Sequence, residues 1–317
     1  MAFAFVFPGQ GSQSVGMLGG LAAAEPQVRA TFEEASHVLG YDLWQLVAEG
    51  PADALNATER TQPAMLSAGV ATWRVWNARG GALPAVLSGH SLGEFTALVC
   101  AQALKFAAAV ELVRYRGELM QQAVPAGSGA MAAILGLEDA QIEAACAEAA
   151  QGAIVEPANF NSPGQVVIAG DAAAVARAIA AAQARGAKRA VLLPVSVPAH
   201  SSLMRAAAQR LAERLGALEL ARPKIRYVSA VDAAAHEEPQ DIRALLVRQL
   251  SSPVRWTDTL RAVSAAPIAQ VIECGPGKVL TALNRRIERR DGLSFLALED
   301  PASLQAALTA TRGDTHA

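Results

Sequence analysis

A glycine-rich turn between two apolar segments constrains this chain more than any other feature. Residues 87–95 read Leu-Ser-Gly-His-Ser-Leu-Gly-Glu-Phe, so Ser91 stands at the centre of a G-x-S-x-G pattern. The apolar residues 85–88 predict a short strand, and residues 92–103 have helical spacing. A sharp strand-to-helix turn around a serine is typical of an α/β sheet in which that serine is a nucleophile. The alternative is an ordinary glycine-rich turn.

The remaining segments predict a mostly parallel sheet covered by helices. Residues 2–7 are apolar on both faces and end at Pro-Gly, as expected for a buried strand of such a sheet. Helices are expected at 22–39, 61–79, 201–215, 239–250 and from 277 onward, and further strands at 225–231 and 268–273. Alternation of this kind indicates an α/β fold.

The segment 127–196 has a different order of elements. Strands are expected at 130–135, 154–159, 165–169 and 189–195, and helices at 139–150 and 172–185. The resulting order βαββαβ is that of ferredoxin-like modules. We therefore expect a large α/β domain made of residues 1–126 and 197–317, with a small ferredoxin-like domain, residues 127–196, inserted in it.

Composition excludes several classes of protein. Of the 317 residues 52% are hydrophobic and 18% charged, which predicts a globular chain with a large core. A net charge of −2 argues against general affinity for nucleic acid or an anionic membrane, and no apolar run approaches the ~18 residues of a membrane span. The cysteines show neither C-x-x-C nor metal-site spacing. We expect a reduced, cytoplasmic location and no bound metal.

A serine nucleophile needs a base, and histidine is the usual one. His316 lies in the tail, and His236 lies in an acidic loop. His37 lies on a helix patterned for the surface, and His90 is too tightly tied to the turn to reach its neighbour. His200 remains, at the seam where the small domain rejoins the large one, and clefts favour such seams. A purely structural histidine is the alternative at this position.

Arg116 falls on the apolar half of an expected helix. At about 100° per residue, the apolar side chains of residues 110–124 occupy one half of that helix, and Arg116 lies among them. A buried guanidinium is costly unless it is paired, and its planar fork suits a carboxylate. The partner is a substrate anion or an internal acid, unless the side chain extends to the surface.

Two glycine-rich loops lack the patterns of nucleotide sites. The loop 8–13 is followed by Ser14 where a dinucleotide fingerprint needs glycine, and residues 275–278 lack both ends of a P-loop. Because the loop 8–13 follows the first strand, it can border the catalytic turn. One of its backbone N–H groups would then complete an oxyanion hole with the N–H of Leu92.

Taken together, these stretches resemble the malonyl-CoA:acyl carrier protein transacylases of bacterial fatty-acid synthesis. The likeness covers almost the whole chain and rests on FVFPGQGSQ (5–13), TQPA (61–64), GHSLGEF (89–95), RYRGELM (114–120), GAMAAI (129–134), NFNSPGQVVIAG (159–170), VSVPAHS (195–201), QLSSPVRWT (249–257) and GPGKVL (275–280). One departure is Val-Ser-Ala-Val at 228–231, where this chain has Ser229 and Ala230 and the family often has asparagine.

The resemblance implies a catalytic dyad rather than a triad. Ser91 would be the acylated nucleophile and His200 its base, with the His200 ring oriented by the main-chain carbonyl of Gln249 instead of an aspartate. The N–H groups of Gln10 and Leu92 would form the oxyanion hole. The implied fold, a hydrolase-like α/β domain with a ferredoxin-like insert, agrees with the order of elements described above.

The resemblance also implies the substrates. Arg116 would clamp the carboxylate of a malonyl group, which passes from malonyl-CoA through Ser91 to the phosphopantetheine thiol of acyl carrier protein. No cofactor and no metal are expected, and a monomer is expected. Neither nucleic acid nor a membrane is an expected partner.

Three other functions stay open from the sequence. A serine thioesterase or hydrolase of the α/β type would need an acid before its histidine, and Asp171 with His200 is the only loosely suitable pair. A trans-acting acyltransferase of a polyketide pathway would use the same residues on another carrier. A scaffold that binds the carrier without catalysis has no physical need for an arginine on an apolar helix face.

Overall fold

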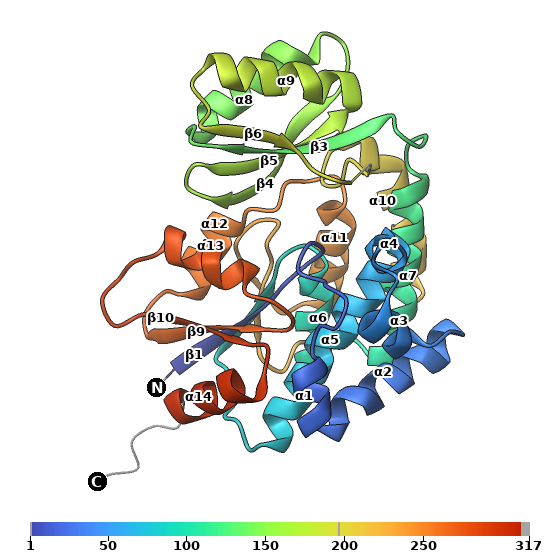
Figure 1. The fold of residues 1–317 in the computed structure, drawn as a ribbon, viewed down its shortest axis with the longest axis vertical. Helices are drawn as coiled ribbons and strands as arrows, with labels where there is room; N and C mark the ends of the chain where they lie inside the picture. Colours follow the sequence, from blue (N-terminus) through green and yellow to red (C-terminus); the bar gives the residue numbers. More distant parts are fainter. Residues whose placement is uncertain (1, 196, 312–317) are drawn as a thin grey trace.

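The computed structural model describes residues 2–195 and 197–311 and contains two sheets (Figure 1). The larger sheet has the order β10-β9-β1-β2-β7-β8, and its neighbours are parallel except for β7 and β8. Its strands are β1 (Ala2–Phe7), β2 (Val86–Gly89), β7 (Arg226–Val228), β8 (Ala235–His236), β9 (Ile268–Cys274) and β10 (Ser294–Leu298). The register places Phe7 opposite Gly89, so the first strand ends beside the serine turn.

Helices cover both faces of this sheet because β1 is apolar on both sides. Phe3, Phe5 and Phe7 point into one hydrophobic cluster, whereas Ala4 and Val6 point into another, as the alternation of a strand requires. The helices around the sheet are α1 (Gly19–Ala24), α2 (Pro26–Leu39), α3 (Leu43–Glu49), α4 (Ala52–Asn56), α5 (Thr58–Ala78), α6 (Gly93–Cys100), α7 (Phe106–Gln122), α10 (Arg205–Gly216), α11 (Pro239–Gln249), α12 (Trp256–Val263), α13 (Val279–Ile287) and α14 (Pro301–Thr311). Within the described residues, none of the helices is both long and apolar enough to cross a membrane.

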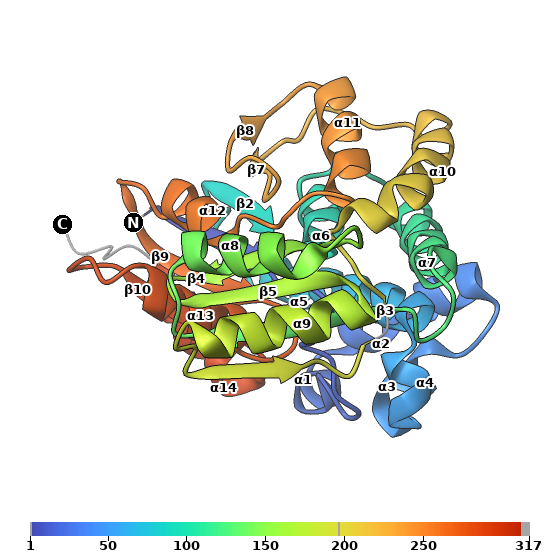
Figure 2. The ribbon, with the colours of Figure 1, turned by 90° about the horizontal axis from the view of Figure 1, so that it is seen from above.

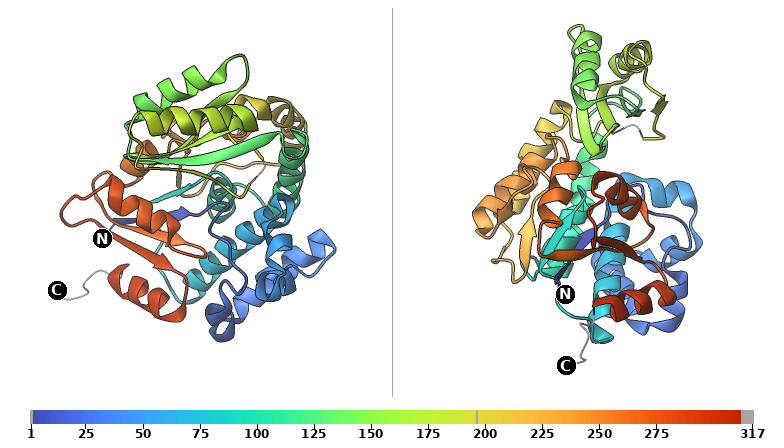
Figure 3. Two further views of the ribbon diagram at one scale, coloured as in Figure 1. Left: turned by 45° about the horizontal axis from the view of Figure 1, so that its top comes forward. Right: turned by 90° about the vertical axis from the view of Figure 1, so that its left-hand side faces the viewer.

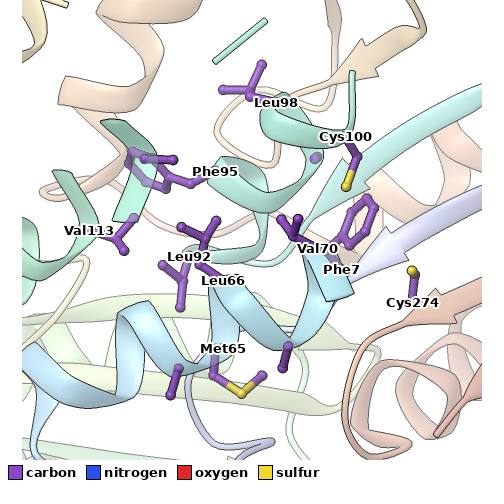
Figure 4. Close-up of a cluster of buried hydrophobic side chains, with 14 of the residues drawn as sticks. Phe7, Met65, Leu66, Val70, Leu92, Phe95, Leu98, Cys100, Val113 and Cys274 are labelled. Carbon is purple, nitrogen blue, oxygen red and sulfur yellow. The ribbon is translucent and has the colours of Figure 1, made fainter. Parts of the chain in front are cut away.

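The core beneath the serine turn is formed by β1, α5 and α6. Figure 4 shows Phe7 of β1 beside Val70 of α5, and Phe95 and Cys100 of α6 belong to the same cluster. Cys100 and Cys274 lie in the same region, and the protein's three cysteines are all buried and unpaired. Each of these side chains removes apolar surface from water, at about 25 cal/mol per Å². The serine turn is therefore anchored on a densely packed base.

The smaller sheet is antiparallel and comes from one continuous stretch of the chain. Its order is β4-β5-β3-β6, and its elements are β3 (Gly129–Leu135), α8 (Asp139–Ala150), β4 (Val155–Ser162), β5 (Gln165–Asp171), α9 (Ala172–Ala184) and β6 (Arg189–Leu192). This is the βαββαβ unit expected from the sequence. Its two helices lie on the outer face of the sheet, as the view from above shows (Figure 2).

The small sheet rests on the large unit through β4 (Figure 3). The N–H of Phe160 donates to the carbonyl of Val254 at 2.9 Å, and the N–H of Val254 donates to the carbonyl of Ala158 at 2.9 Å. Glu156 accepts hydrogen bonds from the backbone N–H and the hydroxyl of Ser202. The contacts of Glu156 hold the chain two residues after His200. We propose a division into domains at 126/127 and 196/197; residue 196 itself lies outside the described residues.

Several elements differ from the expected bounds. Helix α5 begins at Thr58 rather than 61, because Thr58, Thr61 and Gln62 are buried by packing against the rest of the protein. Strand β6 ends at Leu192 rather than 195, and β4 runs to Ser162, which shortens the expected turn. The elements α3, α4, α12, α14, β8 and β10 were not expected from the sequence.

We expect Gly89→Ala to lower the free energy of unfolding by about 3 kcal/mol, the upper range for an overpacked core. A methyl group at Gly89 would lie 1.9 Å from the carbonyl carbon of Gly93, and backbone atoms cannot move aside cheaply. Chemical denaturation monitored by circular dichroism measures the change. The matched control is Gly216→Ala at the end of α10, where an added methyl group meets no atom within 4 Å. Equal effects of the two changes would contradict the prediction.

Candidate active site

Ser91 occupies a strained turn between β2 and α6. The strand ends at Gly89, the helix begins at Gly93, and Ser91 between them has a φ of 51°, in the left-handed region that few residues other than glycine adopt. A methyl group on Gly93 would lie 2.0 Å from the carbonyl oxygen of Phe7. Only glycine therefore allows α6 to approach β1 this closely. The result is a serine raised at the end of the sheet, next to a helix N-terminus.

His200 reaches this serine from the seam between the two sheets. Its Nε2 lies 2.8 Å from Ser91 Oγ, and its Nδ1 lies 2.8 Å from the main-chain carbonyl oxygen of Gln249. A carbonyl oxygen can only accept, so Nδ1 carries the proton and Nε2 is free to accept from the serine hydroxyl. This tautomer is the one that a general base needs.

The backbone of His200 is strained as well. Its φ is 63°, and its N–H donates to the carbonyl of Leu250 at 3.0 Å, which holds the residue against the end of α11. Ser91 and His200 are thus both non-glycine residues with positive φ. Such outliers persist where the surrounding structure enforces them, and they cluster at functional sites.

His200 is neutral in the free protein over the physiological pH range. Burial, and after it the positive charge of Arg116, lowers the pKa of His200 to about 3, while the hydrogen bond to Gln249 opposes the shift. The lowered pKa means that the imidazole stays unprotonated and able to accept a proton well below its usual pKa of about 6.5. His200 can therefore act as a base at neutral pH without first losing a proton.

We therefore expect kcat/KM for acylation of Ser91 to stay flat from pH 8 down to about pH 5, since this parameter reports the free enzyme. A half-loss near the ordinary histidine pKa of about 6.5 would contradict the environment described here. The control is Arg116→Ala assayed with acetyl-CoA. The positive charge of Arg116 lowers the pKa of His200. Its removal should therefore shift the loss of kcat/KM at acid pH toward neutral pH.

Arg116 of α7 points at the same serine from the other side. It is 1% exposed, and its Nη2 donates to Ser91 Oγ at 3.2 Å and to Gln249 Oε1 at 2.9 Å. Its Nη1 donates to Gln62 Oε1 at 2.8 Å, and the guanidinium lies 5.5 Å from the ring centroid of Phe95. Within the described residues it forms no ion pair, and its Nε has no hydrogen-bond partner. This is a buried cation with an unused donor beside the nucleophile.

The loop after β1 lies against the serine turn. A methyl group on Gly9 would lie 2.5 Å from the carbonyl oxygen of His90, so the two backbones are in direct contact there. The N–H groups of Gln10 and Leu92 donate no hydrogen bond within the described part of the chain. The side chain of Gln10 is directed toward Thr58, 3.4 Å from Nε2 to Oγ1. Both N–H groups are therefore available as oxyanion donors.

The other histidines that the structure describes do not contact the serine hydroxyl. The His90 ring bonds to Asn161 Oδ1 at 2.9 Å and packs against Trp256, which ties the serine turn to β4. His37 is exposed on α2, and His236 pairs with Asp232. The sequence candidate His316 lies outside the described residues.

Asp171, the acid that a hydrolase triad would need, belongs to the small sheet. It holds the N-cap position of α9, but its side chain does not cap that helix. Instead, Asp171 Oδ2 accepts from the N–H of Ile154 at 2.7 Å. The Nδ1 of His200 is already bonded to a carbonyl oxygen, so no acid orients it.

Three polar groups of the site were missed by sequence reasoning: the side chains of Gln62, Glu94 and Gln249. Each is at most 1% exposed. The available signal was weak: Gln62 stands where the apolar stretch of α5 begins, and Glu94 is an acid in the first turn of a helix, where its burial could not be foreseen. Among the described residues, no group of three or more His, Cys, Asp or Glu side chains could hold a metal ion.

Comparison with known proteins gives a consistent result. Residues 4–295 match the family model described as "Acyl transferase domain". The malonyl CoA-acyl carrier protein transacylase of Salmonella typhimurium is 56% identical over 307 residues, 97% of this chain and 99% of that relative. The corresponding protein of Bacillus subtilis is 42% identical, over 96% of each chain.

Solved structures agree with the sequence relatives. The acyl carrier protein S-malonyltransferase of Vibrio cholerae superposes with a TM-score of 0.93 at 57% identity, covering 96% of this chain and 99% of that one. A malonyl-transacylase solved in complex with a type II PKS acyl-carrier protein gives a TM-score of 0.96 at 54% identity, covering 98% and 100%. This chain belongs to the acyltransferase family of the malonyl CoA-acyl carrier protein transacylases.

Proposed function

We propose that this protein moves a malonyl group from malonyl-CoA to the phosphopantetheine thiol of acyl carrier protein through an acyl-Ser91 intermediate. The single observation that carries the proposal is the pair of contacts at Ser91 Oγ. A neutral imidazole lies 2.8 Å away on one side, and a buried guanidinium lies 3.2 Å away on the other. A base and a fixed cation around one hydroxyl suit an acyl group that itself carries a carboxylate.

In the first half-reaction Ser91 Oγ attacks the thioester carbonyl of malonyl-CoA. The hydroxyl proton passes to His200 Nε2, and the N–H groups of Gln10 and Leu92 stabilise the negative oxygen of the tetrahedral intermediate. The C–S bond then breaks, and His200 returns the proton to the leaving thiolate of CoA. The carbonyl of Gln249 keeps the Nδ1 proton in place during both transfers.

In the second half-reaction the carrier thiol takes the place of CoA. His200 removes the thiol proton, the sulfur attacks the acyl-Ser91 ester, and the proton returns to Ser91 Oγ as the C–O bond breaks. The reaction needs no cofactor, because each step is a proton transfer or an attack by a group of the protein or of its substrates.

Arg116 would select the acyl group. A malonyl carboxylate would accept from the unused Nε donor and pair with a charge that is otherwise buried without an ion-pair partner among the described residues. An acetyl group would leave the Nε donor without an acceptor and the positive charge without an anion. Sites built around such a polar contact reject analogues that lack it by roughly 10⁴-fold to 10⁵-fold.

The test is the fate of the malonyl group with and without carrier protein. The protein is incubated with labelled malonyl-CoA, and malonyl-carrier and free malonate are separated over time. We expect rapid transfer to the phosphopantetheinylated carrier and slow release of malonate when the carrier is absent. Release of malonate at the same rate without the carrier would instead identify a thioesterase.

Supply of extender units for fatty-acid synthesis is the proposed role. A polyketide pathway is the second candidate, because the partner in one superposed structure is a type II PKS acyl-carrier protein. Transfer rates to a fatty-acid carrier and to a polyketide carrier, measured side by side, separate the two roles. A cytoplasmic location and a monomeric state remain part of the proposal.

A further inference from the structure

A buried carboxylate next to the site has no part in the mechanism described above. Glu94 lies in the first turn of α6, three residues after Ser91, and is 1% exposed. Gln249 Nε2 donates to its Oε1 at 2.6 Å, and the hydroxyl of Tyr227 on β7 donates to its Oε2. A carboxylate removed from water to this degree is costly unless its donors and a nearby cation compensate it.

Gln249 connects this carboxylate to the serine, to its base and to the guanidinium. Its side-chain Nε2 donates to Glu94 and also to the carbonyl oxygen of Ser91 at 3.0 Å. Its side-chain Oε1 accepts from Arg116 at 2.9 Å, while its backbone carbonyl accepts from His200. One residue therefore contacts the serine, its base, the guanidinium and the buried acid.

Glu94, the carbonyl of Ser91 and the guanidinium of Arg116 all favour the same orientation of the Gln249 amide. A carboxylate only accepts hydrogen bonds, so it requires the NH₂ end of the amide, which leaves the oxygen end for Arg116. The reverse orientation would place two acceptors together at Glu94 and two donors together at Arg116. Glu94, together with the Ser91 carbonyl, thus keeps the amide oxygen turned toward Arg116 Nη2 beside Ser91.

The two charges also act on each other through this amide. Burial lowers the pKa of Arg116 to about 10, and the negative charge of Glu94 opposes that shift. Burial raises the pKa of Glu94, whereas hydrogen bonds from Tyr227, Gln249 and Ser229 and from the N–H of Ala230 oppose it. Ser229 and the N–H of Ala230 thus support the carboxylate.

We propose that Glu94 is a positioning residue that sets acyl-group specificity: it orients the Gln249 amide and serves as the resident counter-charge of Arg116. In the free enzyme it would keep the guanidinium protonated and directed at the acyl site, where the malonyl carboxylate then becomes the second anion. The inference rests on the proposed function. It also implies that, once Arg116 is removed, Glu94 repels the malonyl group.

The first test is the pH dependence of malonyl loading in Glu94→Gln. Ser91 acylation by malonyl-CoA and by acetyl-CoA is measured from pH 7 to 10 by rapid quench and intact mass, and the ratio of the two kcat/KM values is plotted. The alkaline fall of this ratio should move about one pH unit toward neutrality in the variant, the effect of losing one nearby opposite charge. An effect of the substitution on the reactivity of Ser91 or His200 changes loading of both substrates, so it cancels in the ratio.

Few other titratable groups can cause the alkaline fall of this ratio. Among the described residues, His200 is the other titratable group that faces Arg116, and burial holds its pKa at about 3, far below this range. Tyr227 faces Glu94, with Asp232 behind it, and its pKa is raised well above 10. Glu94→Asp, which keeps the charge, should keep the wild-type pH dependence of the ratio while loading slows. If the ratio falls at the same alkaline pH in Glu94→Gln as in the wild type, the inference is overturned.

The second test is the double variant Arg116→Ala/Glu94→Gln. If Glu94 repels malonyl in the absence of the guanidinium, the double variant should load malonyl about fivefold faster than Arg116→Ala alone, since one unscreened buried charge has been removed. A merely structural role predicts equal or slower loading in the double variant. That result would also overturn the inference, even if Glu94→Gln alone were too unstable to assay.

The two proposals fail separately. If the wild type forms no malonyl-Ser91, the proposed function fails. If the wild type loads malonyl normally but neither variant behaves as described, only the role of Glu94 fails.

Discussion

Arg116→Ala should lower kcat/KM for malonyl loading by roughly 10³-fold or more while acetyl loading changes far less, so that the preference for malonyl is lost or reversed. The guanidinium is buried beside Ser91 with an unused donor, and a malonyl carboxylate in its place would be desolvated without a partner. Competition between malonyl-CoA and acetyl-CoA, followed by intact mass, measures the preference directly.

The matched control for this change is Arg114→Ala. Arg114 lies two residues earlier on α7, but it pairs with Glu118 at the surface, where ion pairs contribute about 0–1 kcal/mol. Its removal should leave the preference between the two acyl groups unaltered. An unchanged preference in Arg116→Ala would show that another group recognises the carboxylate.

His200→Ala should slow acylation of Ser91 by roughly 10⁴-fold, the upper range for loss of a general base. The structure provides one imidazole within hydrogen-bond distance of Ser91 Oγ among the described residues, and its Nδ1 proton is held by a backbone carbonyl rather than a replaceable side chain. Single-turnover loading with malonyl-CoA is the suitable measurement, because it isolates the first half-reaction.

His37→Ala serves as the control, since that histidine is exposed on α2 and was one of the alternatives in the sequence. It should load at the wild-type rate. Loading by His200→Ala within tenfold of the wild type would mean that another group removes the serine proton.

Much of the fold could be predicted from local patterns. Strand β1 and helix α8 have the expected bounds, because continuous apolar residues define the strand, and an alanine-rich segment that starts with a capping box at Glu138 defines the helix. The elements α3, α4 and β8 have at most seven residues, too few for a hydrophobic period to show. The start of α5 is set by burial against its neighbours, which no local pattern contains.

The candidate site was predictable where one residue broke a pattern. Arg116 stood out because a charged side chain on an apolar helix face demands a reason, and the structure places it beside Ser91. Glu94 did not, because an acid in the first turn of a helix is favoured by the helix dipole alone and gives no hint of burial. Its connection with Gln249 joins residues 155 positions apart and arises only from the sheet order.

The central claim is that Ser91 carries a malonyl group. The most direct measurement is the intact mass of the protein after brief exposure to malonyl-CoA, with Ser91→Ala treated in parallel. The account predicts a gain of one malonyl group in the wild type and none in the variant. No adduct in the wild type, or the same adduct in Ser91→Ala, would contradict it.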